Sequence, residues 1–235
     1  MSSSRLENAP SQPPSPTAGG LFALPIEIRH DIFKRVLAVS DPLYLFQDPG
    51  GPVKSFMPST YKPYAWLALL YTSRQVSYEA RAVLYGVNRF ILEEVELANY
   101  RGKLLNSFIT CIGSVNAGLL SHLRITFPAT ERIDGQSGEI RLTEDSLQDL
   151  RLLQNECTKL TTLEVLVYSQ SSSYLITEDQ DNTEFARDVL LKINAEFRYI
   201  PSLARIILRV SSGSPASSMR AFLDGLGWVV LIGDR

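Results

Sequence analysis

The two histidines and the two cysteines are the side chains best suited to metal binding or nucleophilic chemistry. His30 and His122 stand in different halves of the chain, and neither has a spacing such as His-x-x-x-His that is typical of metal ligands. Both are interpreted as surface or capping histidines. Cys111 lies in the apolar run 108–112 and is predicted to be buried as a small hydrophobic residue. Cys157 follows a predicted helix and is the better candidate for a reactive thiol.

Motifs of the common enzyme classes are absent from the sequence. It contains no Cys-x-x-Cys pair, no Gly-x-Ser-x-Gly hydrolase turn and no Gly-x-x-x-x-Gly-Lys phosphate loop. Gly225-Leu226-Gly227 is too short for a dinucleotide loop and is predicted to stop a helix before Trp228. We therefore predict no catalytic residue, no metal and no cofactor. An unrecognised small-molecule enzyme is the alternative that an enclosed polar pocket would support.

Composition and charge describe an ordinary globular protein. Hydrophobic residues make up 45% of the 235 residues and charged residues 20%, with a net charge of −2. Such a balance gives no overall basic field for nucleic acid or an anionic membrane. The apolar run 65–71 is far shorter than the ~20 residues of a membrane span. With only two cysteines and no signal-peptide pattern at the N-terminus, we predict an intracellular protein, cytoplasmic and/or nuclear.

The N-terminal part of the chain is predicted to be a tail followed by a helix. Residues 1–20 are rich in Ser, Pro and Gly and are predicted to be disordered. Pro25 is placed in the first turn of the helix, which ends at 40–42. The apolar residues of this helix recur at helical spacing and form one wide stripe: Ile28, Ile32, Phe33, Val36 and Leu37.

The next segment alternates apolar runs with prolines and glycines, which interrupt regular secondary structure. The stretch 42–63 carries too many prolines and glycines for continuous regular structure, and we expect an ordered loop or short strands there. A second helix is predicted over about 64–84, with a break near 72–73. A short strand at 90–92 and a helix over about 96–112 follow.

The second half repeats a pattern at regular intervals. Leu120-Ser121-His122-Leu123-Arg124-Ile125 is echoed forty residues later by Leu160-Thr161-Thr162-Leu163-Glu164-Val165, and Ile200-Pro201-Ser202-Leu203 follows at the same interval. Each echo runs into a predicted strand: 125–127, 163–168 and 206–210. Helices are predicted between and after them, at 144–157, 184–199 and 217–226, with a last strand at 228–232. Strand–helix alternation of this kind favours parallel strands joined by helical crossovers.

The predicted fold class is α+β. A helical module at 21–92, with the insertion 40–63, precedes an α/β layer at 93–235 whose mostly parallel strands resemble an irregular leucine-rich repeat.

The module at 21–92 resembles a known family. The residues Leu24-Pro25-x-Glu27-Ile28-x-x-x-Ile32-Phe33-x-x-Val36-Leu37 resemble the opening of an F-box. The downstream residues Leu70-x-x-Ser73-Arg74-Gln75-Val76-x-Tyr78-Glu79-Ala80 and Leu84-Tyr85-x-x-Asn88-x-Phe90 resemble F-box-like proteins abundant in filamentous fungi, most of which have no assigned function. In the F-box family the first helix docks on the Skp-type adaptor of a cullin ubiquitin ligase.

The resemblance implies a non-catalytic substrate receptor of a Skp–cullin–F-box ligase. Its adaptor-binding residues would be Leu24, Pro25, Glu27, Ile28, Ile32, Phe33 and Val36. The insertion 40–63 departs from the short connection usual in an F-box, so a stand-alone scaffold without adaptor binding is the alternative. In that case the apolar stripe packs against the second helix as core. The α/β layer would hold an unknown protein substrate through the expected loops 128–143 and 169–183.

Overall fold

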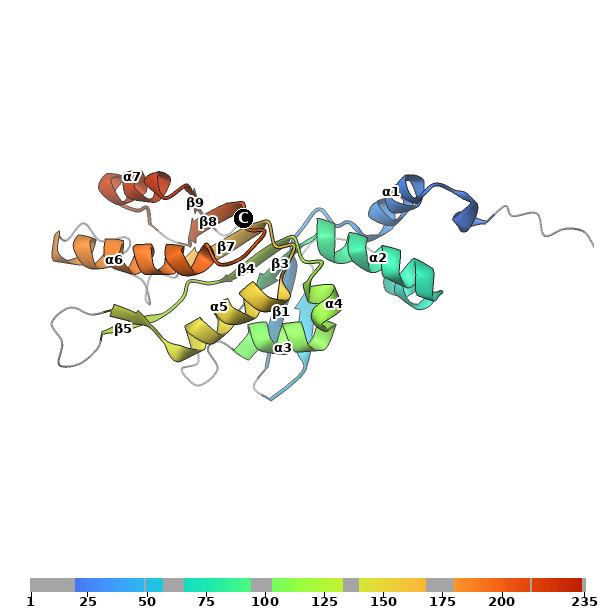
Figure 1. Cartoon of the computed structure of the whole chain (residues 1–235), viewed down its shortest axis with the longest axis horizontal. Coiled ribbons are helices and arrows are strands. Elements are labelled where there is room, and N and C mark those ends of the chain that lie inside the picture. Colours follow the sequence, from blue (N-terminus) through green and yellow to red (C-terminus); the bar gives the residue numbers. More distant parts are fainter. Residues whose placement is uncertain are drawn as a thin grey trace, which may run out of the picture.

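The computed structural model describes residues 20–48, 50–56, 66–93, 103–132, 140–167, 180–211 and 213–233 (Figure 1). It is a mixed α/β structure built on a mostly parallel seven-stranded sheet. The helical elements are η1 (Leu21–Ala23), α1 (Ile26–Leu37), η2 (Trp66–Tyr71), α2 (Arg74–Val87), α3 (Lys103–Ile112), α4 (Ser114–Ala117), α5 (Glu144–Glu156), α6 (Gln180–Phe197) and α7 (Ser217–Gly225). The strands are β1 (Leu43–Gln47), β2 (Val53–Phe56), β3 (Arg89–Leu92), β4 (His122–Thr126), β5 (Thr130–Arg132), β6 (Ile140–Leu142), β7 (Thr162–Val167), β8 (Arg205–Val210) and β9 (Trp228–Ile232).

The order of strands in the sheet follows the order of the chain. The sheet runs β2-β1-β3-β4-β7-β8-β9, and only the β1–β2 hairpin at one edge is antiparallel. From β1 onward each crossover moves one position in the same direction. Because crossovers between parallel strands are right-handed, helices that join strands advancing one way gather on one face of the sheet.

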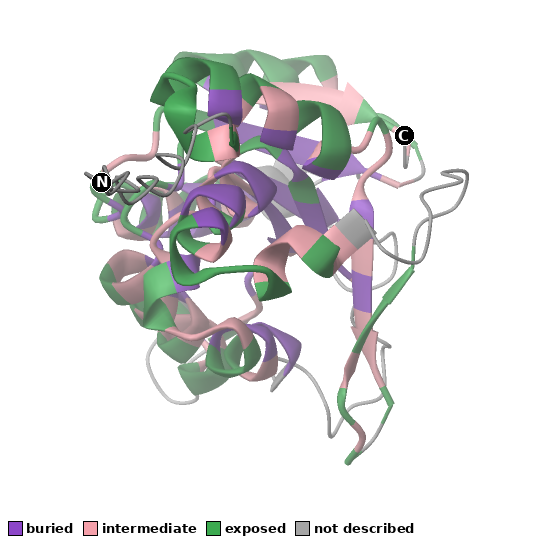
Figure 2. Cartoon of the chain, turned by 90° about the vertical axis from the view of Figure 1, so that its right-hand side faces the viewer, coloured by how far each residue is buried: buried purple, intermediate pink, exposed green. Residues whose placement is uncertain are grey.

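The main core lies between that face and the helices. Alternate strand residues such as Leu123, Leu163 and Leu208 pack with side chains from α3, α5, α6 and α7. Ile91, Leu166 and Ile207 point to the other face; they are buried but belong to neither hydrophobic cluster. Figure 2 shows the buried residues concentrated in the strands and on the inward sides of the helices.

A second, smaller core joins α1 to α2 and η2. Its members are Phe33, Leu37, Val76, Ala80, Val83 and Leu84. Tyr85 is half-buried against both cores and stacks on Phe90 of β3, with ring centroids 5.7 Å apart. The two helices lie beyond one end of the sheet (Figure 1).

Local sequence signals explain where several helices begin and end. Ser73 caps α2 by accepting a hydrogen bond from the Val76 amide, and Thr143 caps α5 in the same way. Gly227 adopts a positive φ of 81° directly after α7, so a residue with a side chain would be strained there. This confirms the prediction that glycines stop the last helix.

Most predicted elements are confirmed, with shifted boundaries. The breaker-rich stretch forms the short strands β1 and β2, and the expected break at 72–73 separates η2 from α2. Mostly parallel strands joined by helices are confirmed, and Leu123 pairs in register with Leu163, forty residues on. The sheet runs across the predicted boundary at 92/93, because β1, β2 and β3 belong to it.

Other predictions are corrected or lie outside the described residues. The expected loop 128–143 contains the antiparallel hairpin β5–β6, since Thr130–Arg132 pair with Ile140–Leu142. Part of the expected loop 169–183 is helical, because α6 begins at Gln180. Residues 1–19 of the predicted tail at 1–20 lie outside the described residues, as do the rest of that second loop, 57–65 and 94–102.

Candidate functional site

Helix α1 carries two apolar ridges on adjacent sides. Phe33 and Leu37 face α2 and are fully buried. Three residues of the second ridge, Ile28, Ile32 and Val36, are four positions apart in α1 and lie one above another along the helix, while Leu24 precedes the helix in extended backbone. We call this set the α1 ridge: Leu24, Ile28, Ile32 and Val36. It extends over about 12 Å between residues 28 and 36.

The α1 ridge is partly exposed to solvent. Leu24 is 37% exposed, Ile28 46% and Val36 37%, while Ile32 is half-buried. Pro25 and Glu27, the other predicted adaptor-binding residues at the helix start, are also exposed. Exposed aliphatic side chains gathered on one side of a helix are typical of a protein-docking surface.

Phe33 occupies a different place from the other predicted site residues. It is 0% exposed and belongs to the small core between α1 and α2. In this structure it is therefore not available to a partner. Its side chain follows Ile32 in sequence, and the two ridges are adjacent on the helix surface. For this reason the apolar pattern alone could not separate the inward residue from the outward ones.

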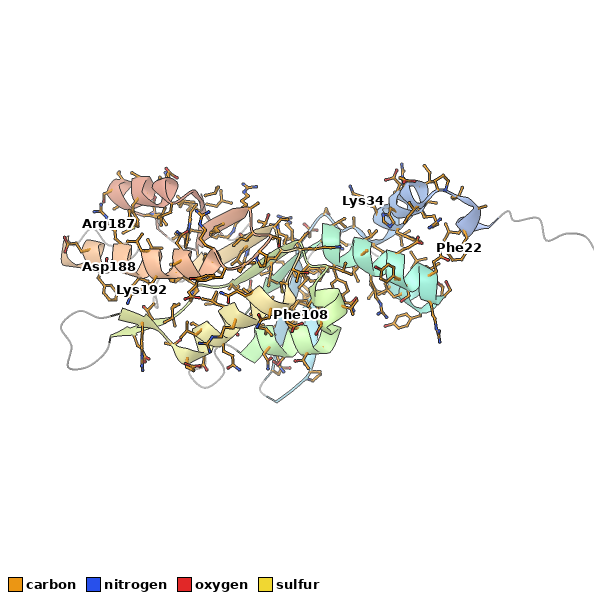
Figure 3. The ribbon with its side chains drawn as sticks, in the orientation of Figure 1. Phe22, Lys34, Phe108, Arg187, Asp188 and Lys192 are labelled. Atoms are coloured by element: carbon orange, nitrogen blue, oxygen red, sulfur yellow. The ribbon has the colours of Figure 1, made fainter. Side chains whose placement is uncertain are left out.

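A buried ion pair fixes the first turn of α1 to α2. The Arg29 guanidinium donates to both carboxylate oxygens of Glu79, from Nε to Oε2 at 2.8 Å and from Nη2 to Oε1 at 2.7 Å. Its third nitrogen, Nη1, donates to the Leu24 carbonyl at 2.6 Å. The guanidinium carbon Cζ lies 5.9 Å from the centroid of the Phe22 ring. Arg29 thereby holds the start of the α1 ridge in place. Figure 3 labels Phe22 at this end of the pair.

The same ion pair shifts the proton affinities of its members. The hydrogen bonds from Arg29 hold the pKa of Glu79 below its ordinary value, against the opposing effect of burial, and Gln75 adds a further bond. The pKa of Arg29 is raised because Glu79 stabilises its charged form. Both groups are therefore charged at neutral pH.

Asn88 fixes the other end of α1. Its side chain is 1% exposed and donates to the carbonyls of Leu37 and Leu84, at 3.0 and 2.9 Å. Its Oδ1 accepts a hydrogen bond from the Val39 amide at 2.8 Å. One amide group thus joins the C-terminal end of α1 to the C-terminal end of α2.

Sequence reasoning missed both of these connections, although a signal exists for each. Arg29 stands four residues before Phe33 and eight before Leu37, on the inward side of the helix. Glu79 stands within the apolar stripe of α2, between Val76 and Ala80. A single arginine and a single glutamate on facing apolar stripes indicate a buried ion pair.

A shallow depression lies between α1 and α2. Its volume is about 270 Å³, and it is lined by His30, Asp31, Lys34, Ala82, Val83, Gly86 and Val87. The side chain of His30 is half-buried at this depression. The arrangement offers a few polar groups on an apolar floor, and it lies away from the α1 ridge.

An ionic cluster occupies the sheet face away from the main core. Glu164 of β7 accepts a bond from Arg209 of β8, pairs with Arg124 of β4 at 2.9 Å and contacts the His122 ring at 3.3 Å. Arg209 also donates to the Gly233 carbonyl at 2.8 Å. His122, predicted to be a surface or capping histidine, is instead a member of this cluster with a side chain 22% exposed.

The cluster makes Glu164 an unusually strong acid. Burial alone would raise its pKa, but hydrogen bonds from His122 and Arg209 and the charge of Arg124 outweigh it and lower the pKa to about 2. Within the described part of the chain, Arg124 Nε is buried without a hydrogen-bond partner. The group consists of linked charges on three neighbouring strands and stabilises their register.

The predictions for the two thiols were wrong. Cys111 is exposed, next to the last residue of α3. Cys157 is 0% exposed, and burial raises its pKa to about 12. It is therefore the less reactive of the two at neutral pH.

Over the described ranges, no three His, Cys, Asp or Glu side chains come together as a metal-binding group would require. None of the helices in those ranges combines the length and apolar character needed to span a membrane. No protein-family model matches the chain, and no curated protein or solved structure matches it either.

Proposed function

We propose that this chain is a non-catalytic protein-interaction adaptor, and that the α1 ridge docks it on the Skp-type adaptor of a cullin ubiquitin ligase. The observation that carries the proposal is the division of α1 into a packed side and a partly exposed apolar side. The resemblance of Leu24-Pro25 and the following helix to an F-box supplies the class of partner. In this role the chain is the substrate receptor, and it binds an unknown protein substrate.

The physical basis is recognition of a preformed helix in an apolar groove. Burying the remaining exposed surface of each aliphatic side chain contributes about 1 kcal/mol, at about 25 cal/mol per Å² of apolar area. Arg29–Glu79 and Asn88 hold α1 rigid, which reduces the entropy lost on binding. Glu27, exposed at the helix start, would add an electrostatic contact that sets the register.

The test is a binding measurement between the full chain and a purified Skp-type adaptor. The variant Leu24→Glu/Ile28→Glu should bind at least about tenfold more weakly, because two charges would enter the apolar groove. The control Val115→Glu/Leu191→Glu changes two exposed aliphatic residues on α4 and α6, 72% and 48% exposed, and should bind like the wild type. Circular dichroism shows whether each variant is folded.

A stand-alone scaffold or binding protein is the second candidate, and a specific observation favours it. Several residues that carry the family resemblance are used inside the molecule: Phe33 in the small core, Glu79 in the ion pair and Asn88 between the helix ends. Internal packing alone therefore accounts for part of the motif. Folded wild-type protein that fails to bind the adaptor would reject ligase docking and leave this candidate.

A further inference from the structure

The side of α2 that faces away from α1 carries alternating aromatic and cationic residues. Val76, Ala80 and Val83 face the small core. Arg74, Tyr78 and Arg81 lie on the opposite side, at the three- and four-residue spacing that aligns side chains along a helix. Tyr71 precedes them at the end of η2. We call these four residues, Tyr71, Arg74, Tyr78 and Arg81, the α2 strip.

All four side chains of the α2 strip are exposed. Tyr71 is 84% exposed and Tyr78 69%, the first being the most exposed large hydrophobic residue among those described. Arg74 and Arg81 are exposed as well. In Figure 3, side chains project from α2 on the side away from α1. Tyrosine and arginine are the residue types most enriched at binding hot spots.

The charge of the α2 strip is uncompensated. Across the described ranges, neither of its two arginines has an ion pair or a side-chain hydrogen bond. The acidic residue of α2, Glu79, is buried on the other side and paired with Arg29. The strip thus places two positive charges within about 10 Å, on a chain whose net charge is −2.

Tyr85 lies on the same helix as the α2 strip, four residues after Arg81. Burial is the main reason that the pKa of Tyr85 is raised, while Arg81 lowers it and Tyr71 raises it by smaller amounts. Tyr85 stacks on Phe90, so α2, the helix that carries most of the strip, is joined to the main core.

We propose that the α2 strip binds an acidic peptide segment of a partner protein. Carboxylates of the segment would pair with Arg74 and Arg81, and its aliphatic or aromatic side chains would pack on the rings of Tyr71 and Tyr78. A polynucleotide is the less suitable occupant. Two arginines would neutralise only about two phosphates, far fewer than the continuous charge of a polynucleotide backbone presents.

This second surface does not depend on the α1 ridge. The two sets of residues lie on different helices, and α1 packs against the side of α2 opposite the strip. One partner could therefore occupy the α1 ridge while another occupies the α2 strip. In the proposed function, the strip would be a site for the substrate or for a regulatory segment.

The test is a selection of short random peptides, displayed on phage, against the immobilised full chain. The enriched peptides should be acidic, and their affinity should fall at high salt. The variant Arg74→Glu/Arg81→Glu should weaken their binding by at least about tenfold. The control Arg151→Glu/Arg220→Glu reverses two exposed arginines on α5 and α7 and should leave binding unchanged.

A tyrosine pair tests the aromatic half of the strip. Tyr78→Ala should weaken the binding of the selected peptides by about tenfold. Tyr199→Ala changes a tyrosine that is 68% exposed and remote in the chain, and it should leave their binding unchanged. A mixed-sequence single-stranded DNA probe that binds more tightly than the best peptide would overturn the proposal. So would neutral or basic enriched peptides, or the absence of any enrichment.

The α1-ridge variant separates this proposal from the proposed function. Peptides bound to the α2 strip should keep their affinity for Leu24→Glu/Ile28→Glu. If Leu24→Glu/Ile28→Glu no longer binds the peptides while Arg74→Glu/Arg81→Glu still does, the peptides occupy the α1 ridge and the proposal for the α2 strip fails. Failure of the chain to bind a Skp-type adaptor has no bearing on this outcome.

Discussion

At the scale of single residues, buried charges are satisfied by close partners on neighbouring elements. Glu164 lies between Arg124 and Arg209, and its side chain is 4% exposed. Removing one member of such a group leaves the others charged and desolvated, which costs more than the interaction itself contributes. The cluster is therefore expected to respond strongly to both substitution and acid.

Replacing Glu164 with Gln should destabilise the protein by about 3–5 kcal/mol at pH 7, because Arg124 and Arg209 would lose their buried anion. Urea unfolding followed by circular dichroism measures the change. The matched control is Glu144→Gln, whose side chain is 81% exposed and pairs with Arg151 at 3.8 Å. It should change stability by less than about 0.5 kcal/mol.

The pH dependence of stability provides a second test of the same carboxylate. Its folded-state pKa of about 2 lies below the ordinary 4.5, so its contribution is complete above about pH 4.5 and is lost as pH falls toward 2. The contribution is about 3 kcal/mol. Stability of the Glu164→Gln variant should fall less steeply than that of the wild type between pH 5 and pH 3. Equal slopes would contradict the assignment.

The two thiols should differ sharply in reactivity. An aromatic disulfide reagent should modify Cys111 quickly in the folded protein, since it is exposed, and reach Cys157 only after unfolding. The release of coloured thiolate, counted before and after adding denaturant, measures this. In Cys111→Ser the fast phase should disappear. A fast phase that persists in that variant would show Cys157 to be accessible.

At the scale of elements, α1 is held at both ends by polar contacts and along its length by a small core. Asn88 satisfies one amide and two carbonyls that the ends of α1 and α2 would otherwise bury without partners. Such a group defines where two helices meet more strictly than apolar packing does, because hydrogen bonds need direction as well as proximity.

Substituting Asn88 with Ala should destabilise the protein by about 2–4 kcal/mol, because three buried backbone groups would lose their partner. Urea unfolding measures the loss. The control Asn155→Ala changes an exposed asparagine at the end of α5 and should change stability by less than about 0.5 kcal/mol. A loss at Asn88 as small as that at Asn155 would rule out its joining role.

Apolar periodicity was sufficient to predict most elements and the parallel strands. It could not reveal the ionic cluster: Arg124 stands between Leu123 and Ile125, a pattern that normally places the polar residue in water. Its burial depends on the register that pairs it with Glu164, a contact between residues forty positions apart. The forty-residue echo aligns the two residues in sequence, but the apolar alternation within each strand does not show that this face of the sheet is buried.

The candidate site was predictable in part for a similar reason. Leu24, Ile28 and Val36 were predicted to bind an adaptor, with packing as core the alternative, and in the structure they are partly exposed. Phe33 was also predicted to bind the adaptor, because it belongs to the same wide apolar stripe. Such a stripe can contact the second helix with one part and an external partner with another. Only the position of α2 decides which part of the stripe is internal.

At the scale of the whole molecule, two hydrophobic cores of unequal size meet at Tyr85. The larger core draws on the sheet and on α3, α4, α5, α6 and α7, whereas the smaller one joins α1, α2 and η2. Local stability follows the amount of apolar surface that a segment buries. The helical pair should therefore open more readily than the centre of the sheet.

Hydrogen exchange followed by mass spectrometry should show this difference. Amides of α1 should exchange at least about tenfold faster than those of β7 and β8, which lie at the centre of the large core. Breaking the ion pair with Glu79→Gln should speed exchange in α1 and leave β7 and β8 unchanged. Uniform protection across both regions would instead indicate one cooperative unit.

The strand order described above also bears on how the protein is made. A ribosome releases a chain from its N-terminal end, and here each new strand of the seven-stranded sheet from β3 onward joins the open edge of the part of that sheet that has already emerged. No paired strands have to separate to admit a later one. A nascent chain paused after α6 could already hold β1, β3, β4 and β7 in their final order, so the sheet can grow during translation one strand at a time.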